Sequence, residues 1–358
     1  MTRYLALDAF RGMTIALMIL VNTPGTWSHV YSPLLHADWD GATPTDFVFP
    51  FFLFIIGSAM FFSFKKTEFL ANSTQFIKIV KRGLIMFFIG FMLNIIPFTT
   101  NPEDWRIMGV LQRIGIAYII ASCLVLLLNR KGILITSVLI LMAYWAILLT
   151  AGGGALTIDG NIIRQFDLNI LGASHMYTMR GVEFDPEGIL STIPAVVSML
   201  IGFEVTRYLT SISDKKTSVI KLTLIGGLAI GVGALWNLVL PINKSLWTPS
   251  YVIFTSGFAC LLLAAFICLI DIFKQNKLTE PLLVYGTNPL FVYVLSFLIV
   301  TLYLNITIDQ TSMYHWIYMQ INSVFEPKLA SFIFALSHVI IFWYVSLKLY
   351  QRKIFIKI

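Results

Sequence analysis

The stretch DFVFPFFLFIIGSAMFFSF, residues 46–64, is an apolar run that carries one charged residue, at its first position. A helix that crosses a bilayer needs about 20 predominantly apolar residues, so this run predicts a membrane span. The whole chain has the same character, because 58% of its 358 residues are hydrophobic and only 12% are charged. Soluble domains average about 25% charged residues. The sequence therefore predicts an integral membrane protein.

Nine further runs resemble the first, and they are continuous, whereas the strands of a β-barrel would alternate between apolar and polar residues. We expect an all-α, polytopic fold with about ten transmembrane helices, forming a single domain over residues 1–358. The first run is not followed by a cleavage site of the A-x-A type, so we expect it to be retained rather than removed as a signal peptide. The expected spans are 9–27, 46–64, 82–98, 108–128, 132–150, 189–208, 222–240, 250–273, 283–304 and 331–350.

The basic residues predict how the chain is oriented. Of its 25 Lys and Arg, 19 fall on one side, in the two tails, in the even-numbered loops or at the span ends that adjoin them. Cytoplasmic loops carry an excess of Lys and Arg, so both termini are expected in the cytoplasm. We expect the protein to lie in the cell (inner) membrane as a multi-pass protein. The same asymmetry explains the net charge of +7 without a nucleic-acid partner.

A titratable cluster precedes residues 46–64. It contains His36, Asp38 and Asp40, and Asp46 follows at the start of the span. Imidazole can accept and return a proton near neutral pH, and a carboxylate can orient it, as in a catalytic triad. Two other interpretations remain open. His36 could bond a loop carbonyl, and H-x-D-x-D could bind a metal, although no second histidine stands at helical spacing. Asp46 could also cap the helix while orienting the ring.

Other polar residues lie inside the expected spans or at their outer ends. Arg113 is within the fourth span, where a charge costs at least about 2.5 kcal/mol, so it should face a protein interior or a water-filled cavity. Asn22 could cap a turn or donate to a carbonyl group in a site. Glu187 could cap a helix or bind a cationic acceptor. A purely structural role for Arg113 remains an alternative.

Two segments outside the membrane have residues suited to binding a sugar. PINKSLW (241–247) provides Asn243, Lys244 and Trp247, and the titratable cluster adds Asp38, Trp39 and Asp40 as candidates for substrate binding. Polar side chains beside an indole ring can bind a sugar, although an interfacial tryptophan is equally typical of the aromatic belt of membrane proteins.

Six blocks of the sequence, in order along the chain, resemble the heparan-α-glucosaminide N-acetyltransferase family. The resemblance covers residues 3 to about 300 and is closest to shorter bacterial members. The blocks are LDAFRGMTIALMILVN (7–22), HADWDGATPTDFVFPFFLFIIG (36–57), GVLQRIGIAY (109–118), FDPEGILSTIPA (184–195), PINKSLW (241–247) and YGTNPLFVYVLS (285–296).

The resemblance implies transfer of an acetyl group from cytoplasmic acetyl-CoA to an amino sugar on the other side of the membrane. It places the active-site histidine at His36, an asparagine associated with the acetyl group at Asn22, and the aspartate before VFPFF at Asp46. The loop between Asn22 and His36 differs from that of the lysosomal members, so heparan is not carried over as the substrate. A homodimer is a further expectation from the family.

Transfer across a bilayer requires a basic cytoplasmic mouth for the anionic nucleotide of CoA, and four residues are candidates for it: Arg11, Lys65, Lys66 and Arg82. Arg11 could instead pair with Asp8, three residues earlier on the same helix face. Direct attack by an amine or hydroxyl, and transfer through an acyl-histidine, both remain open. The rival functions are a transporter or flippase for a sugar-linked metabolite, and a non-catalytic membrane scaffold.

Overall fold

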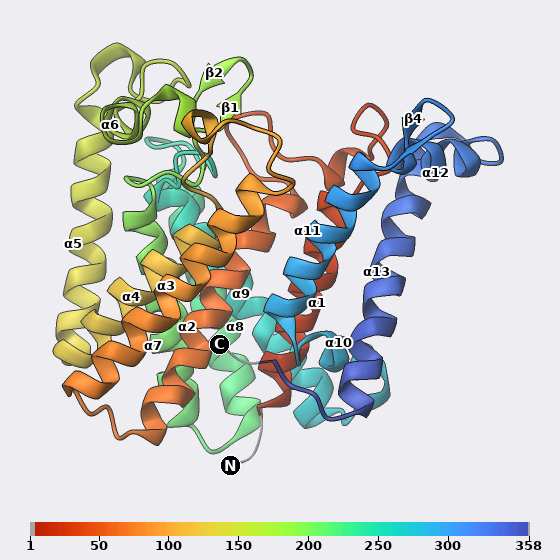
Figure 1. The fold of residues 1–358 in the computed structure, drawn as a ribbon. Coiled ribbons are helices and arrows are strands. Elements are labelled where there is room, and N and C mark those ends of the chain that lie inside the picture. The colour runs from red at the N-terminus through yellow and green to blue at the C-terminus, as the bar shows by residue number, and fades with distance from the viewer. Residues whose placement is uncertain (1–3, 357–358) are drawn as a thin grey trace. The chain divides into compact units, whose positions relative to one another are not determined.

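The computed structural model describes residues 4–356, and nearly all of its regular structure is helical (Figure 1). The chain divides into two compact units, which we treat separately. Unit 1 comprises Met1–Ala37, Ala42–Phe52 and Leu262–Ile358, and unit 2 comprises Asp38–Gly41 and Leu53–Leu261. Two helices, α2 (Val48–Lys66) and α9 (Pro249–Ile267), pass from one unit into the other.

In unit 1, α1 packs against α10, α11 and α13. The amino-terminal half of α1 approaches α10 closely, because a Cβ atom at Gly12 would lie 1.7 Å from the carbonyl oxygen of Leu282. Only glycine permits this approach between the two backbones. The elements of this unit are α1 (Leu5–Asn22), η1 (Ser32–Leu34), η2 (Pro44–Phe47), η6 (Cys268–Ile272), α10 (Asn276–Tyr285), α11 (Pro289–Asn305), β3 (Thr307–Ile308), β4 (Thr311–Ser312), α12 (Met313–Asn322) and α13 (Pro327–Gln351).

In unit 2, α3 packs on α4, and α7 packs against both α4 and α5. The part of α2 in this unit meets α7 where Gly57 faces Met199 and Gly202 faces Phe54. The remaining elements are α3 (Ser73–Ile95), η3 (Pro102–Asp104), α4 (Val110–Leu127), α5 (Arg130–Leu149), η4 (Gly152–Gly154), α6 (Ile162–Leu171), η5 (Ala173–His175), β1 (Thr178–Met179), β2 (Val182–Glu183), α7 (Thr192–Thr210) and α8 (Lys215–Trp236). Strand β1 pairs with β2, and β3 with β4, in two small antiparallel hairpins.

Eight helices among residues 4–356 are long and apolar enough to cross a membrane, and the protein is a multi-pass membrane protein. A ninth span results if α10 and α11, which are bent by 63° at their junction, are counted as one. Each of the ten expected spans overlaps a helix. The expected span 82–98 falls on α3, which contains Lys78, Lys81 and Arg82 and is not among the eight helices that could cross a membrane. The count of ten and the sidedness of the termini stay predictions.

The helix boundaries differ from expectation where caps, rather than apolarity, determine them. The first span was expected to reach residue 27, but α1 ends at Asn22. There Thr23 donates its hydroxyl to the carbonyl oxygen of Ile19, and Pro24 cannot continue the helix. Helix α3 begins nine residues before the expected position 82, because the side chain of Asn72 accepts a hydrogen bond from the backbone N–H of Gln75 and caps it.

Candidate active site

His36 and Asp46 form a hydrogen-bonded pair in unit 1. The imidazole Nδ1 lies 2.6 Å from Oδ1 of the carboxylate. An ionised carboxylate only accepts hydrogen bonds, so with Asp46 ionised the proton of this bond is on Nδ1. The side chain of His36 is 46% exposed, whereas that of Asp46 is 1% exposed. A buried acid thus holds a ring whose other edge reaches the surface.

The buried carboxylate is fixed by donors from its own loop. Oδ2 of Asp46 accepts the backbone N–H groups of Ala37 and Thr43, each at 2.9 Å, and Thr43 adds its hydroxyl at 3.1 Å. Together Thr43 and Asp46 form a capping box at the start of η2, which leads directly into α2. Asp46 is therefore a cap and the partner of the imidazole at once, as the sequence allowed.

Asn22 is the last residue of α1, and its side chain is exposed. The loop after it is tied to α12 and α13. The backbone N–H of Gly25 donates to the carbonyl oxygen of Ser331 at 3.2 Å, and the hydroxyl of Tyr314 donates to that of Pro24 at 2.6 Å. These bonds give the segment between Asn22 and His36 a defined path.

The other acidic members of the cluster have partners in unit 2. Asp38 pairs with Arg180, 3.2 Å away, and Asp40 accepts a 3.1 Å bond from the side-chain amide of Asn243. The indole N–H of Trp39 donates to the carbonyl oxygen of Leu156 at 2.7 Å. Of the three aspartates, Asp46 is thus the one whose hydrogen bond to His36 the structure records, and Asp38 and Asp40 hold the 38–41 segment on unit 2.

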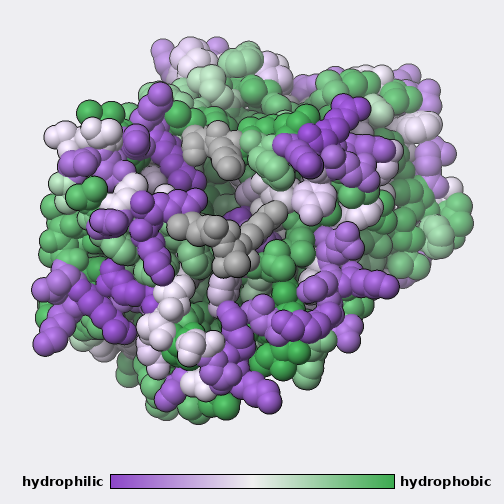
Figure 2. Space-filling view, turned by 90° about the horizontal axis from the view of Figure 1, so that it is seen from below, coloured by the Kyte–Doolittle hydropathy of each residue, from purple (hydrophilic) through white to green (hydrophobic). Residues whose placement is uncertain are grey.

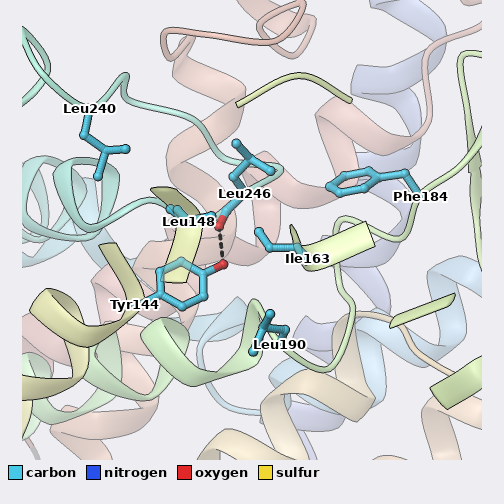
Figure 3. Packing of buried hydrophobic residues seen from close by; sticks show 7 residues of the cluster. All are labelled: Tyr144, Leu148, Ile163, Phe184, Leu190, Leu240 and Leu246. Carbon is cyan, nitrogen blue, oxygen red and sulfur yellow. Dashed lines mark hydrogen bonds between the residues drawn. The ribbon is translucent and has the colours of Figure 1, made fainter. Parts of the chain in front are cut away.

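Figure 3 shows a buried apolar cluster in unit 2. Trp39 packs against this cluster. In that cluster the hydroxyl of Tyr144 on α5 donates to the carbonyl oxygen of Leu246 at 2.7 Å. The bond fastens the 241–247 segment, which sequence analysis selected for sugar binding. The members of the apolar cluster are Tyr144, Leu148, Ile163, Phe184, Leu190, Leu240 and Leu246.

The three polar and aromatic candidates of segment 241–247 differ in exposure. Asn243 is fully buried, and its Oδ1 accepts the backbone N–H of Leu246 at 2.8 Å. Trp247 is 1% exposed, with its ring 5.2 Å from that of Tyr251. Lys244 is partly exposed. Asn243 and Trp247 therefore stabilise the fold of this segment, and their predicted contact with a sugar stays a prediction.

Arg113, in the first turn of α4, has no exposed surface. Its guanidinium donates to the carbonyl oxygen of Pro186 at 2.7 Å and to the hydroxyl of Ser191, and it lies 4.9 Å from the ring of Trp247. The expectation that it faces a protein interior is met by these contacts. They anchor the segment that leads into α7.

A second set of ionic contacts holds the same segment. Arg106 forms a two-pronged ion pair with Asp185, at 2.8 and 2.7 Å, and reaches Glu187 at 2.8 Å. Glu187, expected to cap a helix or bind an acceptor, is thus engaged by an arginine within unit 2. Sequence reasoning did not pair Arg106 with these acids, because 79 residues separate Arg106 from Asp185 and no local spacing signals the contact.

Asp167 on α6 is a further buried acid that sequence reasoning missed. Its Oδ1 accepts the backbone N–H groups of Ile189 and Leu190 at 3.1 and 3.2 Å. Its Oδ2 packs against Gly188, where a Cβ atom would lie 1.8 Å away. Burial raises the pKa of Asp167 to about 6, the hydrogen bond from Leu190 opposing that rise. Its position in a polar stretch of sequence gave no sign of burial.

The residues proposed to bind the donor lie on three helices, α1, α2 and α3. Lys65 and Lys66 occupy the last turn of α2, about 28 Å along that helix from its start. Arg82 on α3 stacks 5.1 Å from the ring of Tyr118. In unit 1, Arg11 pairs with Asp8 at 2.9 Å and donates to the carbonyl oxygen of Gly286 at 3.3 Å. Seen from the side where α2 ends, the surface carries many hydrophilic side chains (Figure 2).

The family described as "Heparan-alpha-glucosaminide N-acetyltransferase, catalytic" matches residues 3–236. The chain belongs to this family. Two curated relatives carry the name heparan-alpha-glucosaminide N-acetyltransferase. The human protein is 27% identical over 352 residues, covering 82% of this chain and 52% of its own length, and the mouse protein is 27% identical over 353 residues, covering 82% and 53%. The chain thus spans about half the length of these relatives.

Membership of the heparan-α-glucosaminide N-acetyltransferase family confirms the resemblance noted in the sequence. The matched residues include the His36–Asp46 pair and the Arg113 region. They end before PINKSLW and YGTNPLFVYVLS, the last two blocks of that resemblance. Among residues 4–356, no group of three or more His, Cys, Asp or Glu side chains is placed to hold a metal ion.

Proposed function

We propose that this protein is a transmembrane acetyltransferase, which moves an acetyl group from cytoplasmic acetyl-CoA to an amine of an amino sugar or glycan on the opposite side of the membrane. The observation that carries the proposal is the 2.6 Å bond between His36 and a buried Asp46, in a chain of this family. The length of α2 supports it further. That helix runs for about 28 Å, close to the roughly 30 Å of a hydrocarbon core, so it is long enough to cross a bilayer.

In the proposed reaction, His36 acts as a general base. Nδ1–H is bound by Asp46, so proton transfer proceeds through Nε2. The neutral acceptor amine attacks the thioester carbonyl carbon and gives one proton to Nε2. The C–S bond then breaks, and the imidazolium returns that proton to the CoA thiolate as it leaves. Asp46 orients the ring and stabilises the imidazolium that forms.

Two further parts of the proposal concern the oxyanion and the donor. Asn22, at the exposed end of α1, is proposed to donate to the developing oxyanion. Arg113 is the second candidate for that role, although the hydrogen bonds described above go to Pro186 and Ser191 and its guanidinium lies against the ring of Trp247. Arg11, Lys65, Lys66 and Arg82 are proposed to attract the phosphates of CoA.

The same geometry supports a route through an acyl-histidine. There Nε2 attacks the thioester carbonyl carbon and displaces CoA as the thiolate. The acetyl-imidazole then passes its acetyl group to the amine, and the proton that the amine loses balances the negative charge of the thiolate. The two routes differ in whether the protein gains the mass of an acetyl group when the acceptor is absent.

Mass spectrometry of purified protein with acetyl-CoA and a set of amino sugars tests the proposal. Wild-type protein should yield an acetylated sugar and free CoA, and His36→Ala should yield neither while remaining folded. Acetylation by His36→Ala at the wild-type rate would reject it. A transporter would instead carry a sugar-linked metabolite into proteoliposomes without any acyl-CoA.

A further inference from the structure

Thr43 contacts both ends of the loop that carries the His36–Asp46 pair. Its Oγ1 lies 2.5 Å from the carbonyl oxygen of Leu35 and 3.1 Å from Oδ2 of Asp46, and its backbone N–H donates to the same Oδ2 at 2.9 Å. A hydroxyl has one proton, which these two acceptors share. Leu35 directly precedes His36. One side chain therefore joins the residue before the imidazole to the carboxylate that binds it.

The two oxygens of Asp46 have separate partners. Oδ1 faces His36, while Oδ2 faces the donors of Ala37 and Thr43. The terminal torsion of an aspartate is broad, so the plane of a carboxylate turns easily unless donors fix it. The backbone N–H groups of Ala37 and Thr43 fix the position of Oδ2, but the carboxylate plane could still turn about that oxygen. The hydroxyl of Thr43, which also contacts the carbonyl oxygen of Leu35, adds a further contact that limits this rotation.

We propose that Thr43 is a positioning residue, whose hydroxyl sets the plane of the Asp46 carboxylate and thereby the orientation of the His36 imidazole. The inference rests on the proposed role of His36 as base or acyl carrier. Thr43 acts through Asp46 and is not itself a catalytic residue.

The competing interpretation is that Thr43 only caps η2. The two roles predict different results for a variant that lacks the hydroxyl. Loss of a cap destabilises the helix start and lowers the melting temperature, but it leaves kcat unchanged below that temperature. Loss of a positioning group lowers kcat in protein that is still folded.

The test compares Thr43→Val, which keeps the shape and the backbone N–H, with Thr43→Ser, which keeps the hydroxyl. Thr45→Val is the matched control, because it removes a hydroxyl from the same turn whose bond goes to the carbonyl oxygen of Pro33 at 3.1 Å. Acetyl transfer from acetyl-CoA to glucosamine is measured below the melting temperature of every variant.

For Thr43→Val we expect kcat to fall about 10- to 100-fold, the usual worth of a hydrogen bond to a charged group, with KM for acetyl-CoA unchanged. Thr43→Ser should restore kcat, and Thr45→Val should retain it. In an Asp46→Asn background, Thr43→Val should cause no further loss, because the group it positions is already gone.

Proton NMR gives a readout that does not depend on turnover. A strong, charge-assisted Nδ1–H bond yields a low-field proton signal, assigned to His36 by its absence from His36→Ala. Wild type and Thr43→Ser should show it, and Thr43→Val should lose or shift it. An unchanged signal would contradict the inference. If Thr43→Val does not fold, Thr43→Cys replaces it as the variant without the hydroxyl. A kcat of Thr43→Cys equal to that of Thr43→Ser would overturn the inference.

The failures of the two proposals differ. A wild-type kcat in Thr43→Val, with His36→Ala inactive, overturns the role of Thr43 alone. Wild-type turnover in His36→Ala overturns the proposed function and the role of Thr43 together.

Discussion

Asp46 presents one carboxylate oxygen to Nδ1 of His36, 2.6 Å away, and the other to the backbone N–H groups of Ala37 and Thr43, in the loop that leads through η2 into α2. The same acid therefore caps the helix and orients the imidazole. Because Asp46 is 1% exposed, water does not compete for this bond. The arrangement fixes which ring nitrogen is left for the reaction.

Asp46→Asn should separate the two roles of this acid. The amide oxygen can still accept the backbone N–H groups, so the helix start should survive. The amide NH₂ would then face Nδ1 and favour the tautomer with the proton on Nε2, which cannot act as a base. We expect kcat to fall roughly 10²- to 10⁴-fold with little change in melting temperature. The check is acetyl transfer at saturating acetyl-CoA. Full activity of Asp46→Asn would show that the bond is not used in catalysis.

Arg113→Met should destabilise unit 2. The substitution removes the donors to the carbonyl oxygen of Pro186 and to the hydroxyl of Ser191, which are contacts of a side chain that is itself fully buried. A loss of about 2–4 kcal/mol is expected, since breaking buried contacts of a charged group is strongly destabilising. Thermal unfolding in detergent measures it. Arg164→Met is the control, because that arginine is partly exposed. An unchanged melting temperature for Arg113→Met would free Arg113 for the proposed oxyanion role.

Asp167 should make stability depend on pH between about 4 and 6. Its folded pKa of about 6 exceeds the ordinary value of 3.8, so the folded state binds more protons than the unfolded state in this window. The free energy of unfolding therefore falls as pH rises from 4 to 6, by up to roughly 3 kcal/mol, and its contribution is constant above. Arg113 opposes the rise in pKa, and Asp185 adds to it.

Asp167→Asn tests this dependence, because the amide stays neutral and retains an acceptor for the N–H groups of Ile189 and Leu190. Melting temperatures at pH 4, 5, 6 and 7 should drop less for Asp167→Asn than for wild type as pH rises. Parallel curves for the two proteins would refute the burial of an ionisable group at this position.

Lys65→Gln with Lys66→Gln should raise KM for acetyl-CoA several-fold and leave kcat unchanged, since the side chains are proposed to attract phosphates rather than to touch the reacting carbonyl. The effect should shrink at high salt, where charges are screened. Lys215→Gln with Lys216→Gln, at the start of α8, is the matched control. If both pairs raise KM equally, the attraction is a general property of the basic surface.

The sequence predicted the helices because an apolar run of about 20 residues is a strong local signal, and all ten expected runs coincide with helices. It predicted their ends less well, since Asn72 and Pro24 determine these through single hydrogen bonds and backbone geometry. The pairing of His36 with Asp46 was among the stated possibilities, because ten residues separate them and both flank one helix start. The sequence could not choose among three aspartates.

The long-range contacts of unit 2 lay beyond sequence reasoning. Arg106 with Asp185, and Asp167 with the backbone at Ile189, join residues that lie far apart in the sequence, and Arg106, Asp185 and Ile189 are in loops that carry no local pattern. Arg113 was expected to face a protein interior or a water-filled cavity, because a charged side chain exposed to lipid within a span has a high free energy. Which carbonyl groups would satisfy it depended on the fold.

The most direct test of the account uses proteoliposomes with radiolabelled acetyl-CoA enclosed on the side of the cytoplasmic face and glucosamine supplied on the other. The account predicts that labelled N-acetylglucosamine accumulates on the glucosamine side with wild-type protein and not with folded His36→Ala. Equal accumulation by the two proteins would contradict it, as would product that forms only when both substrates are on the same side.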